Sequence, residues 1–82
     1  MPCVLIIDDN PSVGEALSLL LSLHDIRSFV ALGPEQGLAL LASEHIDLVI
    51  QDMNFSQDTT SGEEGEALFR AIRAAHPDMP VI

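Results

Sequence analysis

The chain has 82 residues, 48% of them hydrophobic, and 13 acidic residues against three arginines give it a formal net charge of −10. This length allows one domain at most, taken as residues 1–82, and the apolar content argues against disorder. The acidity and the lack of lysine argue against direct contact with nucleic acid or an anionic membrane. The first apolar run ends at Asp8, too early for a signal peptide or a membrane span, so we expect a cytoplasmic protein.

The first predicted elements are a strand and a helix. Residues 3–8 are apolar at nearly every position, which is typical of a parallel strand covered on both faces. Cys3, the only cysteine, lies in this run and is expected to be a packed thiol. Asn10 and Pro11 then suit the N-cap and first turn of a helix that continues to about Leu23. Its apolar residues recur at helical spacing: Val13, Ala16, Leu17, Leu20 and Leu21.

The same alternation continues along the chain. A second strand is predicted at residues 26–32, and a helix begins at Gly33 and Pro34 with Leu38, Leu40 and Leu41 facing inward. A third strand at 46–51 ends on Asp52 and leads into a polar loop at 54–60.

The last predicted helix begins at residues 61–64, whose Ser61 and Glu64 form a capping box. It continues to about residue 76, with Leu68, Phe69 and Ile72 facing inward, and residues 80–82 open a fourth strand. Strict alternation of strands and helices predicts an α/β fold with a parallel sheet and helices on its faces.

Carboxylates follow two of the predicted strands. Asp8 and Asp9 end the first strand and Asp52 ends the third. If these strands are neighbours, their ends lie about 5 Å apart, so three carboxylates would gather at one edge of the sheet. Such crowding is unfavourable without a cation, and hard oxygen ligands favour Mg²⁺. With Asp8 and Asp9 suited to holding the metal, Asp52 is the candidate nucleophile toward phosphorus, forming an aspartyl phosphate.

Two other functions remain open at this point. A Mg²⁺-dependent phosphohydrolase would also use an aspartyl phosphate, but it would need a general acid, typically an aspartate two residues after the nucleophile, where this chain has Asn54. The chain could also act only by assembly, with a vestigial acidic site. The simplest alternative, solvated acids that cap strand ends, is weakened because the acids follow two neighbouring strands.

Three stretches, "VLIIDDNP", "DLVIQDMNF" and "GEALFRAIRAAHPDMPVI", occur in this order along the chain. Together they resemble the receiver domain of bacterial two-component response regulators. The resemblance implies a flavodoxin-like fold of strand order 2-1-3-4-5 that accepts a phosphoryl group from a histidine kinase and is not an enzyme in its own right. It also implies that Asp52 is the phosphoacceptor, that Asp8 and Asp9 are the acidic Mg²⁺ pair, and that Asn54 offers its backbone carbonyl to the metal.

The chain departs from the family pattern at several positions. Ser56 stands where the family usually has proline, Gln51 is polar where it usually has an aliphatic residue, and the loop at 54–60 is longer than usual. The segment is similar to receivers attached to σ54-dependent regulators that contain an AAA+ domain.

A family receiver also needs a Ser or Thr after its fourth strand and a Lys after its fifth. The sequence contains no lysine and stops as the fourth strand opens. We therefore expect a truncated sheet of order 2-1-3-4 that lacks the last strand and helices, with impaired phosphotransfer. The apolar surface left open in such a chain predicts a homo-oligomer.

Overall fold

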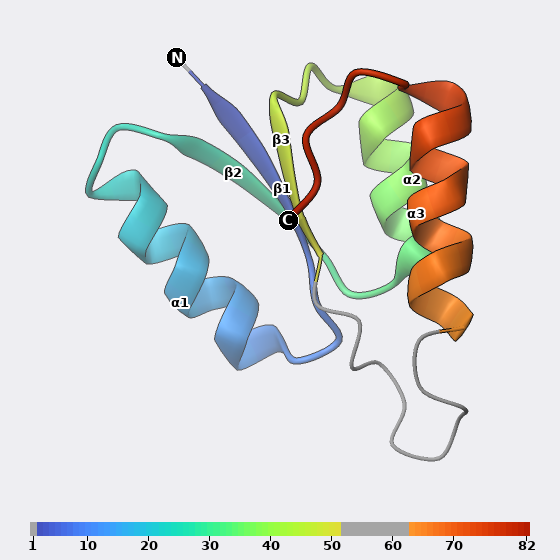
Figure 1. Cartoon of the computed structure of the whole chain (residues 1–82). Coiled ribbons are helices and arrows are strands. Elements are labelled where there is room, and N and C mark those ends of the chain that lie inside the picture. Colours follow the sequence, from blue (N-terminus) through green and yellow to red (C-terminus); the bar gives the residue numbers. More distant parts are fainter. Residues whose placement is uncertain (1, 52–62) are drawn as a thin grey trace.

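A computed structural model describes residues 2–51 and 63–82, except for the side chains of residues 63–66. Within these residues, three parallel strands form one sheet in the order β2-β1-β3: β1 (Cys3–Ile7), β2 (Arg27–Ala31) and β3 (Leu48–Gln51). The helices of this part are α1 (Pro11–Ser22), α2 (Pro34–Ser43) and α3 (Glu63–Ala75). Figure 1 shows α1 on one face of the sheet and α2 with α3 on the other. The predicted α/β fold with a parallel sheet is confirmed.

The predicted fourth strand lies beside β3. Val81 forms a parallel bridge with Val49. The N–H of Ile82 donates to the carbonyl of Val49 at 2.9 Å, and the N–H of Gln51 donates to the carbonyl of Ile82 at 3.0 Å. The order along the sheet is therefore 2-1-3-4 as predicted, although residues 80–82 contribute a single bridge rather than a full strand.

The face of the sheet under α2 and α3 carries the hydrophobic core. Because side chains alternate along a strand, every second residue of β1 points into this core. The cluster of buried residues consists of Cys3, Leu5, Ile7, Ala31, Leu41, Ile46, Val49, Leu68 and Ile72. Full burial of one aliphatic side chain of this kind contributes about 1.5–3 kcal/mol, so this layer is a major source of the stability of the fold.

The prediction that Phe69 faces the core is wrong. Its side chain is 41% exposed, whereas Leu68 and Ile72, four residues apart on one side of α3, are buried. Phe69 lies one position around the helix, where its ring packs against the guanidinium of Arg73, 5.1 Å from the ring centroid.

The inner side of α1 is lined by small residues. Gly14 is buried, and a Cβ at this position would lie 2.6 Å from Cγ1 of Val30, so the helix approaches β2 closely. One turn further on, the hydroxyls of Ser18 and Ser28 form a hydrogen bond of 2.7 Å. Leu20, whose spacing suggested a role in packing, is 52% exposed on the outer side of the helix. No helix in the described part of the chain is long and apolar enough to cross a membrane.

Candidate functional site

The strands end level with one another at one edge of the sheet. Ile7, the last residue of β1, pairs with Ala31 at the end of β2 and with Gln51 at the end of β3. The residue after Ile7 is Asp8, whose N–H continues the ladder by donating to the carbonyl of Ala31 at 3.0 Å. This pairing holds the backbone of Asp8 at the carboxyl edge of the sheet, where ligands bind in folds of this class.

The side chain of Asp8 is buried, with only 2% of the residue exposed, whereas Asp9 is exposed. The carboxylate of Asp8 accepts a hydrogen bond from the N–H of Asn10 at 2.9 Å, which turns the chain directly after the strand. Asn10 then caps α1, because its side-chain oxygen accepts from the N–H of Ser12 at 3.0 Å and Pro11 occupies the first turn. The predicted helix start is confirmed, and it places two carboxylates at the turn between β1 and α1.

Asp52 and Asn54 lie outside the described residues, so the predicted gathering of three carboxylates stays a prediction. Among the residues that are described, no three His, Cys, Asp or Glu side chains form a group that could hold a metal ion. The donors that are described do suit Mg²⁺ in kind, because Asp8 and Asp9 offer hard carboxylate oxygens beside one turn, one of them buried and one open to solvent.

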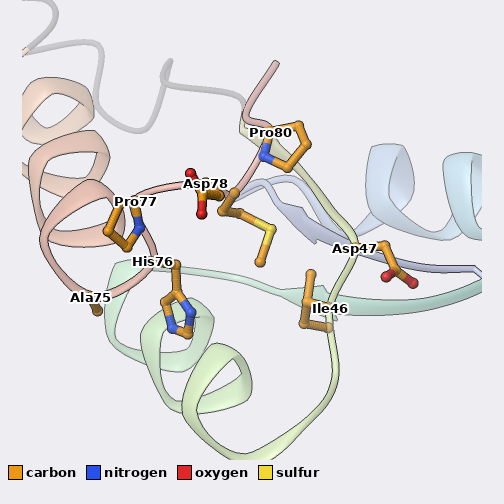
Figure 2. A pocket seen from close by; sticks show the side chains of 8 residues that line it. Ile46, Asp47, Ala75, His76, Pro77, Asp78 and Pro80 are labelled. Carbon is orange, nitrogen blue, oxygen red and sulfur yellow. The ribbon is translucent and has the colours of Figure 1, made fainter.

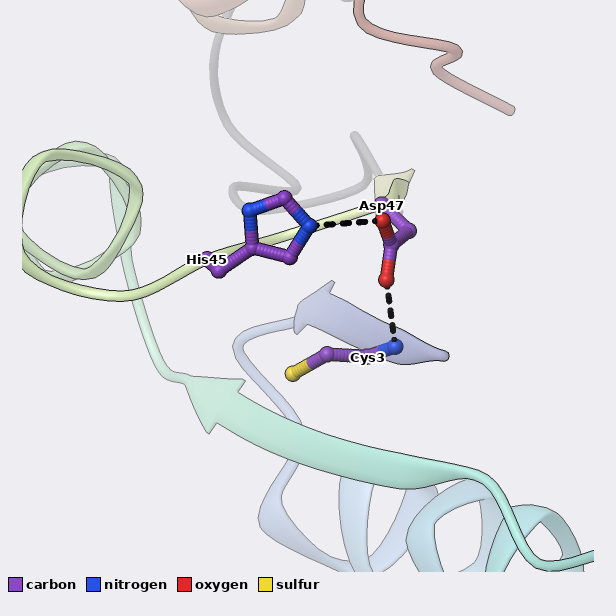
Figure 3. Close-up of polar contacts among 3 residues, drawn as sticks. All are labelled: Cys3, His45 and Asp47. Carbon is purple, nitrogen blue, oxygen red and sulfur yellow. Dashed lines mark hydrogen bonds and ion pairs between the residues drawn. The ribbon is translucent and has the colours of Figure 1, made fainter. Parts of the chain in front are cut away.

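Asp47 is a polar residue of structural importance that the sequence interpretation missed. Its N–H donates to the carbonyl of Cys3 at 2.8 Å. Its carboxylate also accepts from the N–H of Cys3 at 2.9 Å (Figure 3), so the two residues are joined twice. Nε2 of His45 lies 3.0 Å from the other carboxylate oxygen. The signal in the sequence was an aspartate immediately before an apolar run, which can equally well be a solvated strand start.

The thiol of Cys3 takes no part in these contacts. The residue is 5% exposed and belongs to the core cluster, which confirms the predicted packed thiol. Burial raises the pKa of this thiol, so it stays protonated and unreactive near neutral pH.

The contacts of Asp47 predict that the wild-type chain and Asp47→Asn differ in stability by an amount that depends on pH. The hydrogen bond from the N–H of Cys3, followed by the nearby His45, lowers the pKa of Asp47 below its ordinary value of 3.8. The stabilisation by this carboxylate is thus fully present above pH 3.8 and is lost as the pH falls through the lower pKa of the folded state. In urea unfolding, we expect the wild-type chain to be more stable than Asp47→Asn at neutral pH, and the difference to vanish in strong acid. A difference that persists unchanged in strong acid would contradict this origin.

A hollow of about 390 Å³ lies at the opposite edge of the sheet, before the start of β3. Figure 2 shows the side chains that line it: Ile46, Asp47, Ala75, His76, Pro77, Asp78, Met79 and Pro80. Although an imidazole and two carboxylates are among them, they are not part of any metal-binding group in the described portion of the chain. This hollow is separate from the edge that carries Asp8.

Known proteins with similar sequences are bacterial regulators. The chain is 39% identical over 82 positions to the response regulator protein FleR of Pseudomonas aeruginosa, covering 96% of this chain and 16% of that protein. It is 33% identical over 79 residues to the transcriptional regulatory protein GlrR of Escherichia coli K12, covering 96% of this chain and 17% of that protein. The chain thus spans only about a sixth of the length of these relatives.

Solved structures agree with this similarity. A response regulator receiver protein from Pseudomonas putida superimposes with a TM-score of 0.84 at 33% identity, over 98% of this chain and 64% of that one. The response regulator protein TrrA from Thermotoga maritima, solved in complex with Mg²⁺-BeF, gives a TM-score of 0.84 at 27% identity, over 99% of this chain and 66% of that one. The family model of the response regulator receiver domain matches residues 4–82, and the chain belongs to this family.

Proposed function

We propose that this receiver domain, taken as residues 1–82, accepts a phosphoryl group from a histidine kinase on Asp52 in a Mg²⁺-dependent reaction. The observation that supports the proposal is the register of the sheet. Ile7 pairs with Gln51, so β1 and β3 end level with each other, and the next residues in the sequence are Asp8 and Asp52. A level pair of strand ends is what a shared carboxylate site requires.

The metal would be held by the carboxylates of Asp8, Asp9 and Asp52 and by the backbone carbonyl of Asn54. The burial of Asp8 supports this assignment, because a carboxylate held at the sheet edge is a preorganised ligand. When bound, Mg²⁺ would neutralise the negative charge of the carboxylates and of the incoming phosphoryl group. The complex of the relative TrrA with Mg²⁺-BeF is in line with this cofactor.

In the proposed step, a carboxylate oxygen of Asp52 attacks the phosphorus of a phosphohistidine on the kinase. An O–P bond forms and the P–N bond breaks, with its electron pair left on the ring nitrogen. The 82 residues contain no lysine, so no side-chain ammonium group of these residues is available to the phosphoryl oxygens. We therefore propose that phosphotransfer to this chain is impaired.

Labelling with a small phosphodonor tests this function. Incubated with acetyl phosphate and Mg²⁺, the chain is expected to become phosphorylated only to a small extent, with all label on Asp52, because the nucleophile is present and the lysine is not. Mass spectrometry of the intact chain and of its peptides measures the extent and the position. Asp52→Asn should carry no label, and neither should the wild type after removal of Mg²⁺. Stoichiometric labelling of the wild type would contradict the impairment, and label that persists in Asp52→Asn would contradict the assigned acceptor.

The proposal includes a cellular context. The curated relatives are named as regulators, and GlrR as a transcriptional one, which is in line with a σ54-dependent regulator as the parent protein. We place the chain in the cytoplasm and assign it a signalling role rather than catalysis. With a net charge of −10, this segment is not expected to contact DNA itself.

Self-association is a second candidate function, and the outer side of α1 favours it. Three apolar residues of α1 and the residue that follows the helix are exposed: Val13 at 39%, Leu19 at 65%, Leu20 at 52% and Leu23 at 73%. A row of this kind on one side of a helix is unfavourable in water and marks interaction surfaces. We propose that the isolated chain forms a homo-oligomer.

Sedimentation of the purified chain checks this proposal. We expect a weight-average mass above that of the monomer at micromolar concentration, and a shift toward the monomer in Leu20→Lys, which introduces a charge on the exposed row. Ala39→Lys, at an exposed position on α2, is the matched control because it adds the same charge, and it should leave the mass unchanged. A folded wild-type chain that sediments as a monomer would contradict the proposal.

A further inference from the structure

The apolar pattern of β1 and β3 does not by itself select their register. All five residues of β1 are buried and hydrophobic, and the first three residues of β3 are also apolar. Register is strongly specified where one face of a strand is polar and the other apolar, because a slip by one residue then exchanges the faces. In this pair both faces are apolar, so a slipped pairing would still bury hydrophobic side chains. A polar contact at a fixed position can then distinguish between the registers.

Asp47 and Cys3 provide such a contact at the start of both strands. The N–H of Cys3 donates to the carboxylate of Asp47 at 2.9 Å (Figure 3). The carbonyl of Cys3 accepts from the N–H of Asp47 at 2.8 Å. We call these two hydrogen bonds the Asp47 clasp. Peptide groups of a strand alternate in direction, so after a slip by one residue the carboxylate would meet no N–H directed toward it. A slip by two residues keeps the direction of the peptide groups but moves Asp47 away from Cys3. In one of the two directions, the buried N–H and carbonyl of Cys3 would then be left without these partners.

The carboxylate is well suited to this role. The lowered pKa of Asp47 keeps it ionised at neutral pH, and a charged acceptor makes a stronger hydrogen bond than a neutral one. His45, whose side chain is 87% exposed, contacts the second oxygen from outside and is not needed for the bond to Cys3.

We propose that Asp47 is a positioning residue: through the clasp it fixes the register of β1 against β3, in which Ile7 pairs with Gln51, and so sets where β1 delivers Asp8 relative to the end of β3. The clasp acts from the far end of the strands, about 16 Å from Asp8 at 3.3 Å per residue. The part of this inference that concerns Mg²⁺ rests on the proposed function, whereas the part that concerns the register does not.

Two substitutions at Asp47 separate positioning from simple packing. Asp47→Ala removes the acceptor, whereas Asp47→Asn keeps an oxygen that can accept from the N–H of Cys3. The folded chains are compared by NMR, through hydrogen exchange of the Cys3 amide and through cross-strand contacts between Val4 and Leu48, which pair in the present register. In Asp47→Ala we expect faster exchange at Cys3 and weakened or additional cross-strand contacts. Asp47→Asn, although less stable than the wild type, should keep the wild-type cross-strand contacts and a slowly exchanging Cys3 amide.

Mg²⁺ titration of the same chains measures the effect at the other end of the strands. Asp47→Ala is expected to bind Mg²⁺ about tenfold more weakly, which is the size of effect seen when groups that orient metal ligands are removed, and Asp47→Asn should restore the affinity to within about twofold. Ile72→Val is the control for general destabilisation, because Ile72 is fully buried on α3 and makes no part of the clasp. This substitution should lower the urea concentration at which half of the chains are unfolded, and it should leave the Mg²⁺ affinity unchanged.

The outcomes separate the two proposals. Unchanged exchange at Cys3 and unchanged cross-strand contacts in Asp47→Ala would overturn the inference, and so would an equal loss of Mg²⁺ affinity in Asp47→Ala and Ile72→Val. If the wild type binds no Mg²⁺, the proposed function fails, and the NMR data still decide the role of the clasp. If Asp47→Ala does not fold, the Cys3 amide must still exchange slowly in both the wild type and Asp47→Asn, and fast exchange in either would overturn the clasp.

Discussion

Asp9→Ala is expected to weaken Mg²⁺ binding by roughly tenfold or more, because the affinity of oxygen-ligand sites depends strongly on the number of charged ligands. Asp9 is exposed beside the buried Asp8, so its removal takes a negative oxygen donor from the proposed site without opening the core. Titration with Mg²⁺, followed by NMR of the amides of residues 8–10, measures the affinity at the site itself.

A matched variant separates ligation from general electrostatics. Glu15→Ala removes one negative charge from an exposed position on α1, as Asp9→Ala does from the turn before that helix. If Mg²⁺ is ligated by Asp9, Glu15→Ala should change the affinity by less than about twofold, which is the scale of screened surface charges. Equal losses of Mg²⁺ affinity in the two variants would show that only the net charge of the chain affects binding. This result would contradict a Mg²⁺ site that includes Asp9.

Gly37→Val is expected to destabilise the fold by about 3 kcal/mol, at the upper end of the usual effect of overpacking. Gly37 is buried on α2, and a Cβ there would lie 2.5 Å from Cδ1 and 3.0 Å from Cγ1 of Ile7, which is itself fully buried. The added side chain must push α2 away from β1. For a domain of this size we expect the melting temperature to fall by about 10 °C or more, measured by circular dichroism.

Gly33→Ser is the control for this substitution. A Cβ at Gly33 meets no atom within 4 Å, and serine suits the N-cap position that Gly33 occupies before α2. Its melting temperature should equal or exceed that of the wild type. Because Asp8 follows Ile7 directly, any Gly37→Val chain that remains folded should also bind Mg²⁺ more weakly than Gly33→Ser. A Gly37→Val chain as stable as the wild type would show that β1 and α2 leave room for a side chain at this position.

The candidate site was predictable from the sequence only in part. The acids at the end of the first apolar run identified Asp8 and Asp9, and the structure holds this turn at the carboxyl edge of the sheet, as the alternation of strands and helices implied. The difference between them, one buried and one exposed, was not predictable, because it depends on how the turn after β1 folds back over the sheet. The roles of Asp52 and Asn54 remain predictions from the sequence.

The sequence by itself determined the order of the elements, the parallel sheet and the start of α1, because these depend on local patterns: continuous apolar runs, helical spacing and an Asn-Pro pair. The buried sides of α2 and α3 were also predicted through Leu41, Leu68 and Ile72, whereas only the tertiary structure decided the inner side of α1 and the position of Phe69. Gly14 rather than Leu20 faces the sheet, since α1 lies too close to Val30 for a large side chain, and Phe69 lies outside the core beside Arg73. The register of β1 and β3 is also a feature that the tertiary structure decides. Neighbouring strands that are apolar on both faces can pair in several registers, and a contact between residues far apart in the sequence, such as Asp47 and Cys3, selects one.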